Sequence, residues 1–236
     1  MDATQRYAVS GLLESAGRED FAIHLYSRQL HRDPFATVPL MAQYYVLDEV
    51  YPVRPVPVIL WDLLGIMEVE IVHRQWFLEA AEALNPGQEP VPRIVFPEDL
   101  FHGITPPETE PIPGLGRVVQ AMATDIVQEQ RADAIYRYFA RETSGPVSEL
   151  FRDVAEQEQA HRRIFEQALA ELRRGTVLDM WCPICGKTLK LWPRLHAAAD
   201  CGFCGSRFTL GIEAEDFILQ LRADSRNNRR HRILRP

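Results

Sequence analysis

Two Glu-x-x-His motifs have the clearest capacity for chemistry in this sequence. They are Glu70 with His73 and Glu158 with His161. Residues three apart on a helix lie on neighbouring turns of one face, so the carboxylate and imidazole of each motif can reach a common point. Both motifs lie among apolar residues at helical spacing, and burying a carboxylate beside a neutral imidazole is costly unless both bind a cation. A metal ion would supply that charge.

A second repeated pattern, Glu-x-x-Ala-x-x-x-Tyr, supplies two more carboxylates. It runs from Glu19 to Tyr26 and again from Glu129 to Tyr136. Its glutamate and tyrosine are nearly in register on one helical face, and the alanine between them leaves room for close helix approach or for an exogenous ligand. Four carboxylates and two imidazoles in one bundle are the ligand set of a two-metal carboxylate site. The predicted ligands are Glu19, Glu70, His73, Glu129, Glu158 and His161.

Chance does not explain these motifs. Roughly 0.6 Glu-x-x-His matches and about 0.06 matches to the longer pattern are expected at random from the composition, whereas each motif is found twice. Other acidic residues fall off the apolar faces or lack such a context. We interpret these as solvated: Glu68, Glu79, Glu82, Asp125, Asp133 and Glu156.

All four cysteines fall within 23 consecutive residues, in the spacing C-x2-C-x15-C-x2-C. This spacing is typical of one tetrahedral four-thiolate metal site, and it argues against a disulfide framework. The predicted ligands are Cys182, Cys185, Cys201 and Cys204, and the glycine after the second cysteine of each pair lets the backbone turn tightly. The ion can be structural Zn²⁺ or redox-active iron.

Helical periodicity predicts four long helices to position the carboxylates, over residues 3–30, 57–85, 115–143 and 146–174. Proline and glycine mark their ends, and a short helical piece fits residues 39–50. Eight prolines between residues 86 and 114 predict a long crossover between the second and third helices. The fold class is therefore mainly α, a ferritin-like four-helix bundle.

The composition changes after residue 175, where short strand-like pieces alternate with the cysteine pairs. We predict three parts: a di-metal bundle over residues 1–175, a small rubredoxin-like or zinc-ribbon β module over residues 176–212, and a short helix with a basic tail over residues 213–236. The helix is expected at residues 213–221.

The net charge of −7 and the pI near 5.5 argue against a nucleic-acid partner. The longest apolar stretch, residues 56–67, is interrupted by polar or helix-breaking residues and is shorter than the roughly 20 residues needed to span a membrane. The first residues, MDATQRY, do not form a charged and then apolar leader. We therefore expect a cytoplasmic protein without a membrane segment.

Together these motifs resemble the rubrerythrin family, in which a ferritin-like di-iron bundle precedes a rubredoxin-like domain. The resemblance implies that the six bundle residues bind two iron ions and that Tyr26 and Tyr136 donate hydrogen bonds to ligand carboxylates. It also implies a single iron at the four cysteines, which passes electrons to the pair. The implied activity is reduction of hydrogen peroxide, with an electron-donor reductase as partner. We expect peroxide or O₂ as the oxidant and a homodimer as the assembly.

Three features depart from the family pattern, and one is the basic and apolar loop LKLWPRLHAAAD between the cysteine pairs, which also fits a zinc ribbon. Typical rubrerythrins carry an additional glutamate on the third helix where this chain has Ala132, which makes the predicted site pseudo-symmetric and similar to bacterioferritin-like centres. About 22 extra residues separate Glu19 from Glu70 when compared with the Glu129 to Glu158 spacing. Two alternatives therefore stay open: a ferroxidase or iron-handling protein with a structural zinc ribbon, and a non-enzymatic adaptor that uses the basic tail.

Overall fold

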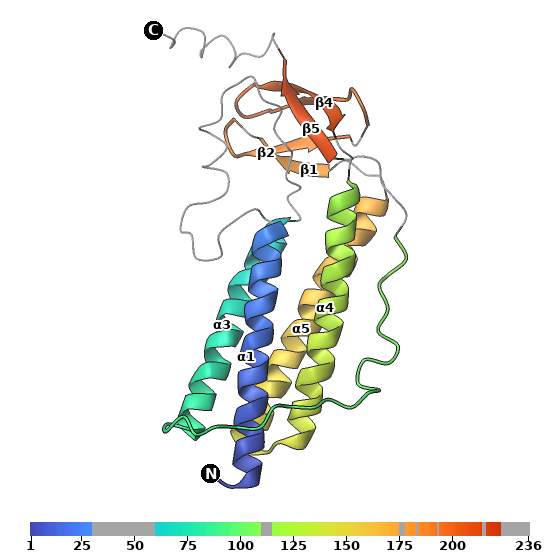
Figure 1. Ribbon diagram of the computed structural model, residues 1–236. Helices are drawn as coiled ribbons and strands as arrows, with labels where there is room; N and C mark the ends of the chain where they lie inside the picture. Colours follow the sequence, from blue (N-terminus) through green and yellow to red (C-terminus); the bar gives the residue numbers. More distant parts are fainter. Residues whose placement is uncertain are drawn as a thin grey trace. The chain divides into compact units, whose positions relative to one another are not determined.

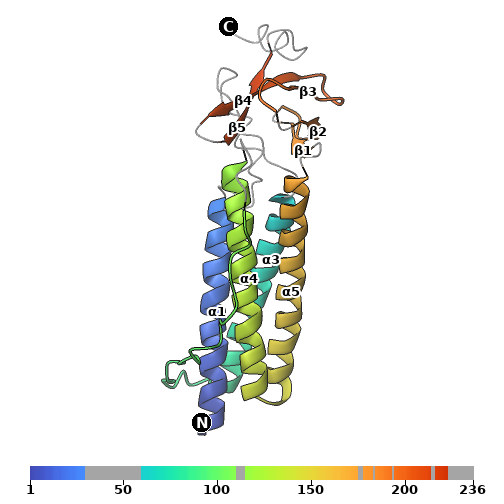
Figure 2. The same ribbon diagram turned by 90° about the vertical axis from the view of Figure 1, so that its right-hand side faces the viewer.

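Four helices make up most of the described chain before the cysteines. They are α1 (Ala3–Gln29), α3 (Leu60–Leu84), α4 (Gly116–Glu142) and α5 (Gly145–Arg173), and they run alongside one another in both views of the ribbon (Figure 1, Figure 2). The computed structural model describes residues 1–29, 60–109, 115–174, 178–182, 184–192, 194–213 and 216–222. The predicted helical piece at residues 39–50, the additional residues between the first two helices and the tail from residue 223 lie outside the described residues.

Local interactions explain the start of α1 and the turn between α4 and α5. At the start of α1, the Gln5 backbone N–H donates to Asp2 Oδ1 (2.8 Å) and the Asp2 backbone N–H donates to Gln5 Oε1 (3.2 Å). This reciprocal pair satisfies N–H groups that have no partner within the helix. The α4–α5 turn contains Gly145 at a φ of 61°, a left-handed conformation that costs glycine little. The sequence places a helix boundary at the same turn.

Aromatic rings fill the bundle core next to the candidate ligands. Phe139 and Phe151 are fully buried and stack with ring centroids 5.0 Å apart. Phe77 lies 5.3 Å from the Tyr136 ring and 5.5 Å from the Phe151 ring. Such pairs add to the stabilisation that comes from removing apolar area from water. The packed rings therefore fix the helix register from which the ligand side chains project.

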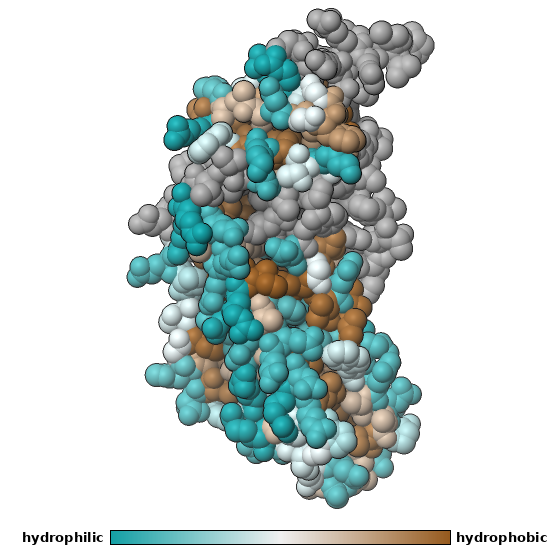
Figure 3. Space-filling view, turned by 180° about the vertical axis from the view of Figure 1, so that it is seen from behind, coloured by the Kyte–Doolittle hydropathy of each residue, from teal (hydrophilic) through white to brown (hydrophobic). Residues whose placement is uncertain are grey.

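The described residues fall in two compact units. The first contains Met1–Gln29, Leu64–Glu108 and Ala123–Glu166, and it holds every predicted ligand of the bundle. The second contains the five strands and all four cysteines. No described helix is long and apolar enough to span a membrane. On the face shown in Figure 3, hydrophilic side chains are interspersed with smaller hydrophobic groups.

The strands form two small antiparallel sheets. One pairs β1 (Leu178–Trp181) with β2 (Thr188–Leu191), and the other has the order β3–β4–β5, from β3 (Ala198–Asp200), β4 (Arg207–Glu213) and β5 (Asp216–Leu221). The predicted class, a mainly α four-helix bundle with a small C-terminal β region, is confirmed.

The prediction of a short helix at residues 213–221 is wrong, because β5 occupies most of that segment. It pairs with β4 in continuous antiparallel register, from Phe208 opposite Leu221 to Glu213 opposite Asp216. Leu219 is buried and Gln220 is exposed, as expected where side chains alternate across a sheet. Pairing with β4 outweighs the weak local helix preference of the glutamates around residue 215.

Candidate metal centres

Six buried ionisable side chains meet inside the bundle. The structure brings together all of the residues predicted as bundle ligands, and none of their side chains is more than about a tenth exposed. Each helix contributes: α1 carries Glu19, α3 carries the Glu70 motif, α4 carries Glu129 and α5 carries the Glu158 motif. Four other glutamates that the sequence analysis placed on solvated faces are exposed, as predicted: Glu68, Glu79, Glu82 and Glu156.

His73 is the centre of one group of ligands. Its Nδ1 lies 3.0 Å from Glu70 Oε2, 3.2 Å from Glu158 Oε1 and 3.9 Å from Glu19 Oε1. One donor atom from each of these four residues lies within 4.8 Å of the others. A single ion in this group would have three carboxylates and one imidazole nitrogen around it.

His161 is the centre of a second, overlapping group. Its Nδ1 lies 3.0 Å from Glu70 Oε1 and 3.8 Å from Glu129 Oε2. The second group consists of Glu70, Glu129, Glu158 and His161, again within 4.8 Å. Glu70 and Glu158 belong to both groups, and the two imidazole rings stack with centroids 6.0 Å apart. The arrangement therefore fits two neighbouring ions that share two carboxylates.

The two tyrosines of the longer motif are donors in a crossed pair of hydrogen bonds. Tyr26 on α1 donates to Glu129 Oε1 on α4, and Tyr136 on α4 donates to Glu19 Oε1 on α1 at 2.5 Å. Burial raises the pKa of both tyrosines well above its usual value, so both hydroxyls stay protonated. Each bond fixes the orientation of one unshared carboxylate, which is how outer hydrogen-bond partners position metal ligands.

Gln157 is a member of the site that the sequence analysis missed. Its Oε1 lies 3.1 Å from His73 Nε2 and can accept the proton on that nitrogen. With its proton on Nε2, a neutral His73 would have the lone pair of Nδ1 free for a metal ion, since a neutral imidazole carries only one N–H. The sequence offered one signal for this role, because Gln157 directly precedes the glutamate of the second Glu-x-x-His motif.

Electrostatics show that this cluster is costly without a cation. Burial raises the pKa of Glu19, Glu129 and Glu158 well above the usual value, and neighbouring glutamates raise it further. Burial also opposes ionisation of Glu70, but the two histidines near its oxygens outweigh that effect and lower its pKa to about 2. Four carboxylates cannot all be charged here at low cost unless cations neutralise them.

Unpaired buried atoms provide an independent test of whether metal fits the site. Glu70 Oε1, Glu129 Oε2, Glu158 Oε1 and His161 Nδ1 are buried, and none makes a hydrogen bond of good geometry with a described residue, although His161 Nδ1 lies only 3.0 Å from Glu70 Oε1. Buried polar atoms without partners are uncommon in native proteins. All four face the two overlapping groups, and carboxylate oxygens and imidazole nitrogens are metal donors. The residues present therefore fit a pair of metal ions.

Asp125 corrects one sequence prediction. It was interpreted as solvated but is fully buried, and Gln29 Nε2 donates to its Oδ1 at 2.7 Å. Burial raises the pKa of Asp125 to about 7 although the Gln29 bond acts in the opposite direction. Asp125 lies one turn before Glu129, so it shares the inward face of α4. Asp133 is half-buried and pairs with Arg137 at 2.7 Å.

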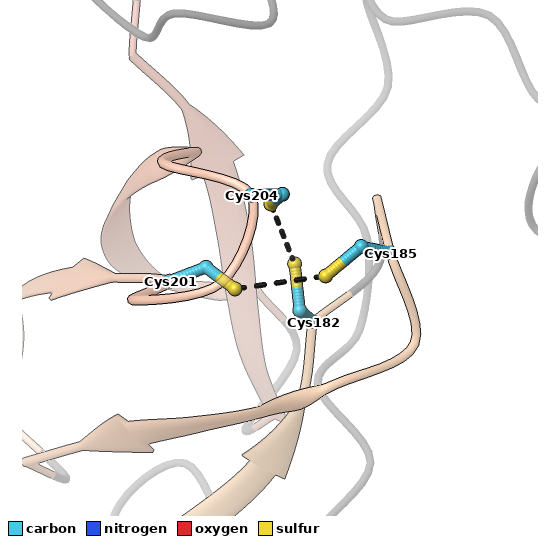
Figure 4. A group of neighbouring side chains, drawn as sticks. All are labelled: Cys182, Cys185, Cys201 and Cys204. Carbon is cyan, nitrogen blue, oxygen red and sulfur yellow. Dashed lines mark hydrogen bonds between the residues drawn. The ribbon is translucent and has the colours of Figure 1, made fainter.

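The four cysteines converge from two similar turns (Figure 4). The Sγ atoms of Cys182 and Cys204 are 3.7 Å apart, and those of Cys185 and Cys201 are 3.6 Å apart. Four thiolates arranged tetrahedrally at about 2.3 Å from one ion would be separated by about 3.8 Å. All four sulfurs lie within 4.8 Å of one another, so the set fits a single tetrahedral metal ion.

The backbone of the two cysteine turns repeats almost bond for bond. Gly186 N–H donates to the Cys182 carbonyl and Gly205 N–H donates to the Cys201 carbonyl, both at 2.9 Å. Both glycines have positive φ, 68° and 72°. The predicted role of these glycines in tight turns is confirmed. Hydrogen bonds with the Ser206 side chain and backbone outweigh burial and lower the pKa of Cys204 to about 7, whereas burial raises the pKa of Cys182 and Cys185.

The fold and the two centres define a class of protein: a four-helix bundle with a buried di-metal carboxylate site, followed by a four-cysteine metal module. The rubrerythrin family model matches residues 121–182, about a quarter of the chain. The matched segment contains Glu129, Tyr136, Glu158, His161 and the first cysteine, so the resemblance to the rubrerythrin family is confirmed on the half of the site that α4 and α5 supply. No curated protein and no solved structure gives a significant match.

Proposed function

We propose that this protein is a rubrerythrin-like di-iron oxidoreductase that reduces peroxide or O₂. The observation that carries the proposal is the pair of overlapping Glu and His groups, several of whose buried donor atoms make no hydrogen bond of good geometry with a described residue. The family match supports the same class of chemistry.

Two divalent ions would be held symmetrically. Glu19 and His73 would bind one ion and Glu129 and His161 the other, and Glu70 and Glu158, which belong to both groups, would be available to both. Four carboxylates balance the charge of two divalent cations, so the loaded centre is close to neutral inside an apolar core. When bound, two iron ions supply two electrons to a peroxide, and H₂O₂ + 2 e⁻ + 2 H⁺ gives 2 H₂O as the O–O bond breaks.

The chain's own residues orient the centre and exclude water from its aromatic side. Tyr26 and Tyr136 hold the unshared carboxylates through the crossed hydrogen bonds, so these ligands do not have to reorganise when substrate arrives. Gln157 would keep the His73 proton on Nε2. The fully buried Phe77, together with its stacked neighbours, closes the core beside the site.

The four-cysteine centre is proposed as the entry point for electrons, with iron as its ion and a reductase as the donor. An assembly of two copies is part of the same proposal. The sulfur geometry supports one tetrahedral ion, and N–H···S bonds such as that from Ser206 to Cys204 stabilise thiolate charge.

Metal analysis combined with a visible spectrum of the purified protein tests the centres first. Two irons in the bundle and a coloured iron–thiolate centre are expected, followed by peroxide turnover when the protein is reduced. Glu70→Ala and His161→Ala should lose bundle metal, whereas Glu68→Ala, an exposed site on the same helix as Glu70, should retain it. Unchanged metal content in Glu70→Ala would refute the ligand assignment. If the reduced protein does not turn over peroxide and the cysteines hold zinc, the redox function is refuted.

A second candidate is a ferroxidase or iron-handling protein with a structural zinc ribbon. The observation in its favour is the symmetry of the site, in which the tyrosine bonds cross between α1 and α4 and Ala132 takes the position of the additional family glutamate. Rapid oxidation of Fe²⁺ by O₂ with no peroxide turnover, together with a colourless four-cysteine centre, would favour this candidate.

A further inference from the structure

An open groove of about 430 Å³ lies between α1 and α4 and leads to the bundle site. The two helices lie next to each other in both ribbon views (Figure 1, Figure 2). Glu19, Glu129 and Glu158 line the groove together with both tyrosines, whereas neither ligand histidine does. The groove therefore approaches the carboxylate side of the candidate centre.

The groove is much larger than peroxide or O₂ requires. A water molecule takes up about 30 Å³ in the liquid, so the groove has room for on the order of fourteen waters. Its volume falls within the range of sites for small organic molecules, about 300 to 1,000 Å³. The space indicates an organic ligand that extends outward from the centre.

Small residues keep the groove open. Gly17 and Ala22 on α1 and Ala132 on α4 line it. A Cβ added at Gly17 would meet nothing within 4 Å, so helix packing does not require glycine there. A glycine inside a helix costs about 1 kcal/mol relative to alanine. The open space beside Gly17 is therefore a feature of the groove and not a point of close helix contact.

Two arginines line the groove beside Glu14. Arg18 and Arg131 both line it, and their guanidinium groups lie 5.1 Å from the Phe96 ring centroid and 5.9 Å from the Phe101 ring centroid. Arg18 pairs with Glu14 at 2.9 Å, but its Nε is buried and has no partner among the described residues. Arg131 has no carboxylate partner in the part of the chain that the structure describes. A ligand carboxylate would complement these groups.

Part of the wall is apolar, and Glu14 and Gln128 also line it. Leu13 and Phe21 line the groove with their side chains 43% and 58% exposed, one on each side of Gly17 along α1. Large exposed apolar side chains beside a concave surface are a feature of ligand sites. The groove thus combines apolar side chains, two arginines and the candidate metal ligands.

We propose that the groove binds organic hydroperoxides that carry a carboxylate. The apolar body lies along Leu13 and Phe21, the carboxylate pairs with Arg131, and the peroxide end points toward Glu19 and Glu129. This inference rests on the proposed function, because the reduced di-iron pair supplies the electrons. In the reaction ROOH + 2 e⁻ + 2 H⁺ → ROH + H₂O, the O–O bond breaks, two O–H bonds form and the protons come from water.

Binding of octanoate to the full-length protein as purified tests the groove without turnover. Calorimetry should show that Gly17→Leu, which fills the groove, raises the Kd about tenfold or more. Gly65→Leu is the matched control, because Gly65 is also an exposed helical glycine with open space at its Cβ but lies outside the groove. Its Kd should stay within about twofold of the wild-type value.

Arg131→Gln is a second variant that leaves the helix contacts in place. It should raise the octanoate Kd about tenfold through the lost charge contact and leave octanol binding unchanged. Arg141→Gln, an exposed arginine on the same helix that is not part of the groove, is the control. The proposal would be overturned if the wild-type protein did not bind octanoate. The same holds if a second copy of the chain covers the groove and prevents binding. Equal affinities of Gly17→Leu and Gly65→Leu would overturn it as well.

Turnover separates this inference from the proposed function. With the reduced protein, kcat/KM for 8-hydroperoxyoctanoate should exceed that for H₂O₂ and should fall in Gly17→Leu but not in Gly65→Leu. Octanoate binding without any peroxide turnover would refute the redox function and leave the carboxylate site in place. Turnover of H₂O₂ with no preference for the organic hydroperoxide would refute the substrate class alone.

Discussion

Replacing Asp125 with asparagine tests the electrostatic reasoning about this core. Asp125 is fully buried, and within the described part of the chain its one hydrogen bond comes from Gln29 Nε2. The second carboxylate oxygen, Oδ2, is buried and has no partner among the described residues. Asparagine keeps the Oδ1 acceptor for Gln29 and has nearly the same shape, but it cannot ionise. The substitution therefore removes one titration and preserves the packing.

The magnitude follows from the pKa of Asp125, which burial raises from 3.8 to about 7. Because this folded-state pKa is above the unfolded value, its favourable contribution is present below about pH 4 and is lost as the pH rises toward about 7. A shift of about three units corresponds to about 4 kcal/mol in total. About 2 to 3 kcal/mol of it is lost between pH 5 and pH 8.

Urea denaturation of both proteins across this pH range measures the effect. The stability of Asp125→Asn relative to wild type should increase by about 2 to 3 kcal/mol between pH 5 and pH 8. Titration of the glutamates is common to both proteins and cancels in the difference. Parallel stability curves would show that Asp125 does not titrate in this range, and the assignment of a buried, neutral aspartic acid would then be wrong.

Three further predictions test other parts of the molecule. Tyr136→Phe removes the bond to Glu19 and should weaken metal binding in the bundle about 10- to 100-fold in equilibrium dialysis. Tyr138→Phe should not, because the Tyr138 hydroxyl accepts a hydrogen bond from Tyr7 and not from a ligand residue; equal affinities would contradict the positioning role. Cys185→Ala should remove one metal per chain and unfold the cysteine module, with bundle metal unchanged in elemental analysis; loss of all metal would contradict separate centres. Phe139→Ala should lower the free energy of unfolding by about 3 to 5 kcal/mol, and a loss below about 1 kcal/mol would contradict tight packing against Phe151.

Much of the bundle site could be predicted because helix geometry is local. The Glu-x-x-His spacing places both donor groups on one face whatever the rest of the chain does. Both histidines do present Nδ1 to Glu70, and all six predicted ligands are buried together. The cysteine spacing is equally local, since each pair lies on one turn with its own glycine.

Burial of single residues was less predictable, because it depends on what packs opposite them. Asp125 was assigned to a solvated face, although it precedes Glu129 by one helical turn and faces Gln29 of another helix. The segment from Asp216 to Leu221 was predicted to be helical and pairs with β4 instead. In both cases the deciding contacts come from residues distant in the sequence.

The sequence by itself determined the types of donor groups and their order along the helices, because these follow from residue identity and from the helical repeat. It could not determine which tyrosine serves which glutamate. Residues seven apart on a helix are separated by about 10.5 Å along its axis, too far for a direct hydrogen bond. Only the tertiary structure, by packing α1 against α4, pairs Tyr26 with Glu129 and Tyr136 with Glu19, because each hydroxyl needs an acceptor that its own helix cannot place within reach.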